Sequence, residues 1–197
     1  MSYDSFDHAK CLDKCVVDIG GRRFDVSSTI LASRSAYFYQ CFMESSFIES
    51  QKRCLDLSKV EEINADDFHQ FLRHAYVISE PMDGDSYISL LKCADYFTSE
   101  QILKEAENFI ITHCSPEKWQ ANKKSAKKPF AINLITGIEL AFKYHLELAK
   151  AHMMKMLGRL RFHTFLRDYP EVMQLAPELR LWIFDYYSKK IIATQKV

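Results

Sequence analysis

A short hairpin near the N-terminus constrains the fold more than any other feature of the sequence. The segment CVVDIGGRRFDV, residues 15–26, places Gly20-Gly21 between two stretches of alternating apolar and polar residues. Two-residue type I′ turns need positive φ at both positions, which glycine adopts at little cost. A loop of this length sets the strand register, so Val17 faces Phe24 on the apolar side. The sequence therefore predicts an antiparallel pair with one buried face and one charged face.

Helical periodicity dominates the chain after this hairpin. Only five glycines and five prolines occur among 197 residues, which favours long helices over many short strands. One short alternating stretch, RCLDL at 53–57, predicts a third strand, and the preceding SSFIESQKR at 45–53 is predicted to be an exposed loop. Apolar residues recur at helical spacing in four segments before residue 115, which are 29–43 with a break near Ser33–Ser35, 68–76, 87–97 and 102–110. The pattern predicts an α+β protein.

A weak internal repeat links the two halves of the chain. Residues 93–110 and 140–157 superpose at an offset of 47, and each copy is expected to form two helices joined by a tight turn. The second copy carries three methionines, Met153, Met154 and Met156, which either fill gaps between helices or form an adaptable binding surface.

A Lys-rich segment separates these halves. Residues 115–129, SPEKWQANKKSAKKP, are flanked by prolines and contain four lysines within six residues. Such a segment is either a solvated linker or a nuclear-import signal. The region beyond it, 130–190, again shows helical periodicity and is predicted to be a separate helical unit.

Charge and composition exclude several classes of protein. Lys and Arg number 26, as do Asp and Glu, so the net charge is zero and neither nucleic acid nor membrane is an expected partner. No apolar run approaches the roughly 18 residues of a membrane span, and the N-terminus lacks a signal-peptide core. We therefore expect a cytoplasmic and/or nuclear protein, in which cysteines such as Cys41 and Cys93 act as small apolar residues rather than disulfide partners.

The sequence offers weak candidates for metal binding and catalysis. His8, Cys11 and Cys15 supply three ligands where zinc prefers four, and Cys15 points into the predicted hairpin core. His113 and Cys114 are sequence neighbours at a helix end, a poor geometry for mutual hydrogen bonding. No hydrolase, phosphate-loop or metalloprotease motif occurs. The prediction is a protein that is not an enzyme, with no metal and no cofactor.

The order of these features resembles a known domain. A hairpin with G-x-x-F, then ILASRSAYF, a third strand, and helices ending in LLKCADYF resemble the BTB/POZ domain over residues 13–114. The resemblance implies a small β-sheet wrapped by helices. Residues 130–190 are similar to the helical BACK or three-box extension, and residues 1–12 would be a dimerisation arm. The whole looks like the speckle-type adaptors of cullin-3 ubiquitin ligases.

The resemblance assigns one stretch to cullin binding. In those adaptors the loop before the third strand carries an apolar residue, any residue and then Glu, and the apolar side chain enters a pocket on the N-terminal domain of cullin-3. Phe47, Ile48 and Glu49 match this pattern, and Tyr96 is assigned to the same surface. The alternative is that Phe47 folds back onto its own domain.

The resemblance also implies a homodimer through apolar contacts at Tyr3, Phe6, Ile30 and Leu31. Tyr3 and Phe6 could equally belong to a frayed terminus.

This chain departs from the family at a charged pocket that many BTB dimers form from an acidic and a basic residue. Lys14 and Ser28 occupy the matching positions, Asp13 is one residue away, and the family's neighbouring histidine is Ser27. The departure puts the binding of co-repressor peptides in doubt.

The resulting hypothesis is a cullin-3 adaptor that recognises an unidentified protein substrate. The chain contains no MATH or kelch module, so either the helical extension binds the substrate or a recognition domain lies outside this sequence. The competing hypothesis is a BTB scaffold or transcriptional regulator that never binds a cullin.

Overall fold

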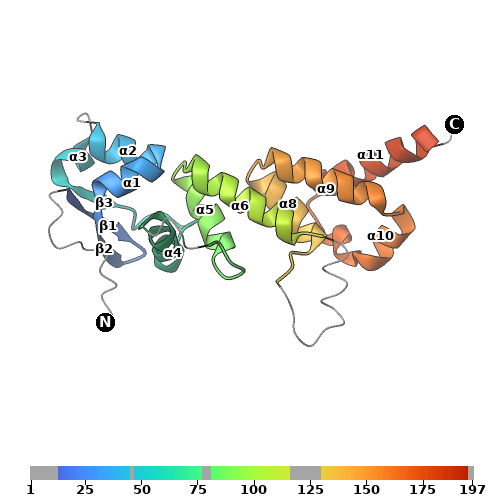
Figure 1. The fold of residues 1–197 in the computed structure, drawn as a ribbon, viewed down its shortest axis with the longest axis horizontal. Coiled ribbons are helices and arrows are strands. Elements are labelled where there is room, and N and C mark those ends of the chain that lie inside the picture. Colours follow the sequence, from blue (N-terminus) through green and yellow to red (C-terminus); the bar gives the residue numbers. More distant parts are fainter. Residues whose placement is uncertain (1–12, 45–46, 77–80, 116–129, 195–197) are drawn as a thin grey trace. The chain divides into compact units, whose positions relative to one another are not determined.

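The structure, a computed structural model, describes residues 13–44, 47–76, 81–115 and 130–194. The chain divides into two compact units, Met1–Phe109 (unit 1) and Ile110–Val197 (unit 2). Among the described residues, no helix combines the length and the apolar character that crossing a bilayer requires. The elements, in chain order, are β1 (Lys14–Ile19), β2 (Arg22–Ser27), α1 (Ser28–Arg34), α2 (Ala36–Met43), α3 (Ile48–Lys52), β3 (Cys54–Asp56), α4 (Ala65–Tyr76), α5 (Tyr87–Tyr96), α6 (Glu100–His113), α8 (Leu134–Lys143), α9 (Glu147–Arg159), α10 (Phe162–Asp168), the 3-10 helix η1 (Pro170–Gln174) and α11 (Pro177–Thr194) (Figure 1).

The β-sheet of unit 1 has three strands in the order β2-β1-β3. Strand β1 pairs antiparallel with β2 in the predicted register, with Val17 opposite Phe24. Gly20 and Gly21 adopt φ of 55° and 73°, as a type I′ turn requires. Strand β3 runs parallel to β1 and places Leu55 beside Val17. These three side chains are buried, so the predicted apolar face is the face that covers the core.

An aromatic cluster fills the core of unit 1. It consists of Phe38, Phe42, Phe68, Phe71 and Phe97, which are all buried and which come from α2, α4 and the end of α5. The rings of Phe38 and Phe97 are in closest contact, with centroids 4.7 Å apart. The apolar stripes predicted on these helices therefore meet at one place, and burial of five large rings supplies much of the hydrophobic stabilisation of the unit.

Polar side chains start the helices of unit 1. The side chain of Ser27 accepts from the backbone N of Ile30 and begins α1, and that of Ser35 accepts from the N of Phe38 and begins α2. The predicted break is therefore confirmed and occurs at Ser35. Asn64 caps α4 by accepting from the first backbone amides of that helix. Each cap satisfies donors that a helix start would otherwise leave without partners.

The segment predicted as a loop before the third strand contains a short helix, α3. Arg53 ends α3 with a φ of 52°, in the left-handed region. Its carbonyl accepts from the N of Val16 at 2.9 Å, and its Nη1 donates to Ser28 Oγ at 2.9 Å. The prediction of an irregular loop is wrong because five residues are too few to show a helical period. A helix this short is held by its surroundings rather than by its own propensity.

The internal repeat is confirmed in the geometry of its turns. Thr98 between α5 and α6, and His145 between α8 and α9, lie 47 positions apart and adopt φ of 52° and 53°. Few residues other than glycine adopt this conformation, so its occurrence at equivalent positions shows that the two turns are built alike. The same three backbone hydrogen bonds close both turns: Phe97 N to Cys93 O, Thr98 N to Asp95 O and Ser99 N to Ala94 O in the first, and Tyr144 N to Leu140 O, His145 N to Phe142 O and Leu146 N to Ala141 O in the second.

The region 130–190 is helical, as predicted, and has its own buried core. Met153 and Met156 are buried, which confirms the core alternative for two of the three methionines. Cys114 forms a parallel bridge with Ile132, and the N of Ile132 donates to the carbonyl of His113 at 3.0 Å. The Lys-rich prediction concerns residues 116–129, which lie outside the described residues.

Candidate functional site

Exposed apolar side chains of unit 1 gather on one short stretch. Among its described residues, the large hydrophobic side chains that remain exposed are Tyr39 (53%), Met43 (40%), Phe47 (39%) and Ile48 (62%). We call these four residues the α2–α3 surface. Tyr39 and Met43 are one turn apart on α2 and share a side of that helix. Such a concentration of apolar groups in contact with water is typical of a protein-binding surface.

Phe47 remains partly exposed rather than packing wholly into its own domain. It stands at the start of α3, and its backbone N donates to the carbonyl of Glu44 at 3.3 Å. The aromatic cluster consists of rings from α2, α4 and the end of α5, and α3 contributes no residue to the buried core of unit 1. Helix α3 packs instead beside α2 and β3. The exposed fraction of 39% leaves the ring available to a partner.

Tyr37 packs against the predicted binding residue Tyr96. Its ring lies 6.1 Å from that of Tyr96 and 5.6 Å from that of Phe97, between centroids. Burial raises the pKa of Tyr37, and the neighbouring Cys41, Tyr96 and Glu49 raise it further; its hydroxyl also hydrogen-bonds Cys41. The structure thus packs the ring of Tyr37 on α2 against the end of α5.

The predicted dimer residues fall in different places. Ile30 is partly exposed on α1, whereas Leu31 is fully buried. Successive helical residues are rotated by about 100°, so the residue after Ile30 points into the core of its own unit. We therefore leave Leu31 out of any dimer surface. Tyr3 and Phe6 lie outside the described residues.

The charged pocket expected in many BTB dimers is replaced by contacts within the chain. The carboxylate of Asp13 accepts from Ser27 Oγ at 2.5 Å and from the N of Thr29 at 3.1 Å. Lys14 Nζ lies 3.3 Å from a carboxylate oxygen of Asp25 on the neighbouring strand. Asp13 thus stabilises the start of α1, and Lys14 pairs on the charged face of the sheet.

Two of the described cysteines, Cys15 and Cys114, are buried in the two units. Burial raises the pKa of the Cys15 thiol to about 12, and burial does the same for Cys114, so both remain neutral thiols at physiological pH. Cys114 Sγ lies 3.6 Å from Met153 Sδ inside unit 2. Within the described ranges, no cluster of three or more potential metal ligands forms. His8 and Cys11 of the proposed zinc set lie outside those ranges.

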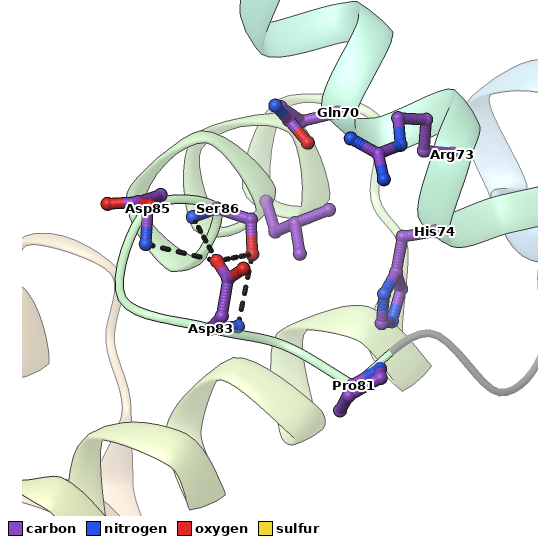
Figure 2. Close-up of a pocket in the computed structure, with 8 residues that line it drawn as sticks. Gln70, Arg73, His74, Pro81, Asp83, Asp85 and Ser86 are labelled. Carbon is purple, nitrogen blue, oxygen red and sulfur yellow. Dashed lines mark hydrogen bonds between the residues drawn. The ribbon is translucent and has the colours of Figure 1, made fainter. Parts of the chain in front are cut away.

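A polar pocket of about 190 Å³ lies between α4 and the segment that leads into α5. Figure 2 shows Arg73 and His74 on one side and Asp83, Asp85 and Ser86 on the other. Asp83 Oδ1 accepts from the backbone N of Asp85 and from both the N and the Oγ of Ser86. Hydrogen bonds from Ser86 lower the pKa of this carboxyl. The acid therefore serves to start α5, and the mixed charges of the pocket favour no single class of ligand.

Sequence reasoning missed Tyr39 and Met43 as surface residues. The sequence signal was present, because both lie off the apolar stripe of Phe38, Cys41 and Phe42 that the helical period places in the core. An apolar residue off the buried stripe of an amphipathic helix is a candidate for a contact with another molecule.

Comparison with protein-family models identifies one family. The model of the BTB/POZ domain matches residues 3–114, which is more than half of the chain. A search of curated proteins found no match. The match agrees with the three-stranded sheet and surrounding helices of unit 1. BTB domains associate with one another and with other proteins, and they are generally not enzymes. The chain belongs to the BTB/POZ family of protein-interaction domains.

Proposed function

We propose that this chain is a substrate adaptor of a cullin-3 RING ubiquitin ligase and that it docks on the N-terminal domain of the cullin through the α2–α3 surface. One observation carries the proposal. The exposed large hydrophobic side chains among the described residues of unit 1 lie between Tyr39 and Ile48, and this stretch includes the Phe47-Ile48-Glu49 pattern. Phe47 and Ile48 thus belong both to the sequence pattern and to the exposed apolar surface of unit 1.

The proposed interface uses Phe47 as its anchor. An aromatic ring that is partly exposed in the free protein gains hydrophobic stabilisation when a partner covers the rest of it. Tyr39 and Met43 extend the apolar area along α2. Glu49 lies in the first turn of α3, two residues after Phe47, so its carboxylate stands next to the proposed anchor in the chain.

The same proposal includes a homodimer and a helical extension. Ile30 on α1, together with Tyr3 and Phe6, would supply the apolar contacts between two copies. A dimer would present two docking surfaces and raise the avidity for a multivalent client without new contacts. Unit 2 would act as the BACK-like extension, and the protein would work in the cytoplasm, the nucleus or both.

The direct test is the affinity for the purified N-terminal domain of cullin-3. We expect the double variant Phe47→Ala/Glu49→Ala to bind about 30-fold more weakly than the wild type, equivalent to ~2 kcal/mol, because it loses the aromatic anchor and the carboxylate of the pattern together. Isothermal titration calorimetry would measure both affinities.

The matched control is Phe130→Ala in unit 2, since Phe130 is 40% exposed and Phe47 is 39% exposed. Its affinity for the cullin should equal that of the wild type. Equal binding by the double variant and the wild type would show that the motif does not contact the cullin. No binding by the wild-type protein would favour the alternative of a BTB scaffold or transcriptional regulator.

A further inference from the structure

Unit 2 carries a strongly basic segment in a chain that is neutral as a whole. Between Leu148 and Arg167 the sequence has five Lys or Arg residues and no Asp or Glu, although acidic and basic residues number 26 each in the full chain. This segment forms most of α9, the connection after it and α10 (Figure 1). We call four of its exposed residues, Lys155, Arg159, Arg161 and His163, the basic surface; Arg167 is also exposed but pairs with Asp168.

Among the residues that the structure describes, none of the four side chains of the basic surface forms an ion pair. Three acidic residues close to it in the chain or on α11 pair with other basic residues. These pairs are Glu147 with Lys150 at 2.7 Å, Asp168 with Arg167 at 2.9 Å, and Asp185 with Lys189 at 2.6 Å.

Helix capping does not account for all of these charges. Basic residues commonly stabilise the C-terminal end of a helix, where carbonyls lack partners. In α9 that role belongs to Lys190, whose Nζ donates to Gly158 O at 2.7 Å and to Leu160 O at 3.3 Å. Arg161 is the N-cap residue of α10, where the helix dipole disfavours a cation, and the first turn of α10 contains no acidic residue. Arg159 lies in the last turn of α9, where the dipole favours it, whereas α10 gives Arg161 no stabilising role.

The scaffold holds the charges in a defined place. Lys155 and Arg159 are four residues apart on α9 and share a side of the helix. Phe162 follows Arg161 directly and packs its ring against Tyr187 and Phe184 of α11, with centroids 5.0 Å and 5.8 Å away. The backbone that carries the basic surface is thus anchored to the core of unit 2.

We propose that the basic surface binds an acidic, extended segment of a partner protein. Guanidinium groups form bidentate hydrogen bonds with carboxylates, and a row of cations favours a chain with carboxylates at short intervals. Interactions between exposed charges are largely screened beyond about 8 Å at physiological salt, so acidic residues farther away on this neutral chain do not repel a short bound peptide. A long nucleic acid would meet those acidic residues, which makes it the less suitable ligand.

The partner would be a client of the ligase only if the cullin-3 adaptor function proposed above holds, whereas the binding itself does not depend on it. The basic surface lies in unit 2 and the α2–α3 surface lies in unit 1, so each can be altered without changing the other.

The test uses the full chain and two fluorescein-labelled peptides of about 12 residues, one alternating Glu with Ser and one alternating Gln with Ser. We expect the Glu peptide to bind at least about tenfold more tightly than the Gln peptide at about 50 mM salt, with the difference shrinking as salt rises. The variant Arg159→Glu/Arg161→Glu should lose about tenfold in affinity for the Glu peptide. Fluorescence anisotropy would measure each affinity.

The matched control is Lys104→Glu/Lys189→Glu, which changes the net charge by the same amount at two exposed lysines that each pair with a carboxylate four residues away. This control should keep the affinity of the wild type. Circular dichroism would confirm that the variants fold, and the milder Arg159→Gln/Arg161→Gln would replace a variant that does not.

Three results would overturn the proposal. They are equal affinity for the two peptides, an equal loss in the control, and tighter binding of a 20-nucleotide single-stranded DNA or of phosphatidylserine vesicles than of the Glu peptide. Failure of the proposed function gives a different pattern. In that case Phe47→Ala/Glu49→Ala leaves the affinity for the cullin unchanged, while Arg159→Glu/Arg161→Glu still lowers the affinity for the Glu peptide.

Discussion

Replacement of Phe38 by alanine is expected to lower the free energy of unfolding of unit 1 by about 3–5 kcal/mol. The ring is fully buried and touches rings from several elements, with centroids 4.7 Å from Phe97, 6.1 Å from Phe42 and 6.2 Å from Phe68. Its removal leaves a cavity that the surrounding rings cannot close without moving α2 relative to α4 and α5. Urea denaturation followed by circular dichroism would measure the loss.

The adjacent residue provides the control for this prediction. Tyr39 is the next residue on α2 and is exposed, so Tyr39→Ala should change the free energy of unfolding by no more than about 0.5 kcal/mol. A loss below about 1 kcal/mol for Phe38→Ala would contradict the central place of that ring in the core. Comparison of Phe38→Ala with Tyr39→Ala also distinguishes an effect on stability from an effect on binding. Tyr39→Ala should weaken the proposed cullin complex while leaving the free energy of unfolding nearly unchanged.

The second large effect is expected at Gly137 on α8, where valine should cost about 3 kcal/mol through overpacking. A Cβ at this position would lie 2.9 Å from Cys114 Sγ and 3.0 Å from Met153 Cε. Both neighbours are buried, and the short cysteine side chain cannot move away without displacing its own backbone. Thermal and chemical unfolding of the variant would show the loss as a lower midpoint for unit 2.

Gly158 on α9 is the matched glycine for this comparison. A Cβ there would lie 2.7 Å from the hydroxyl of Tyr186, the far end of a long side chain that can swing aside. Removal of a helical glycine also brings a small gain in helix propensity. Gly158→Val should therefore stay within about 1 kcal/mol of the wild type. Equal losses at the two glycines would show that close packing around Gly137 is not the reason for its identity.

Local chemistry made the hairpin and the helix starts predictable from the sequence. Gly20-Gly21 specifies a turn, the turn specifies the register, and serine or asparagine at a cap specifies where a helix begins. The direction of β3 was not predictable, because a parallel partner is reached through a long connection and leaves no mark in either strand. The short helix α3 was not predictable either, because five residues are too few to show a helical period.

The candidate site was predictable only in part. The Phe47-Ile48-Glu49 pattern was found by resemblance, but the packing of Tyr37 against Tyr96 and Phe97 depends on where α5 ends in space. Leu31 was misassigned because one residue of difference in a helix decides between surface and core.

Two acidic residues, Asp66 and Asp67, stand in the first turn of α4, where the helix dipole favours negative charge, and Asp66 is exposed there. Asp67 is buried, however, and accepts from Ser89 Oγ at 2.5 Å while Lys92 lies 3.4 Å away. Burial of a single carboxylate depends on helices that are distant in sequence, and no local pattern reports it.

The matching turns at Thr98 and His145 bear on the order in which the chain folds. Each turn is closed by hydrogen bonds between residues a few positions apart, so little conformational entropy is lost before favourable contacts form. The pairing of Val16 with Cys54 joins residues separated by three helices and requires a much larger loop to close. Contacts of low sequence separation form faster, so the helical pairs of the repeat are suited to serve as early folding nuclei on which the slower sheet assembles.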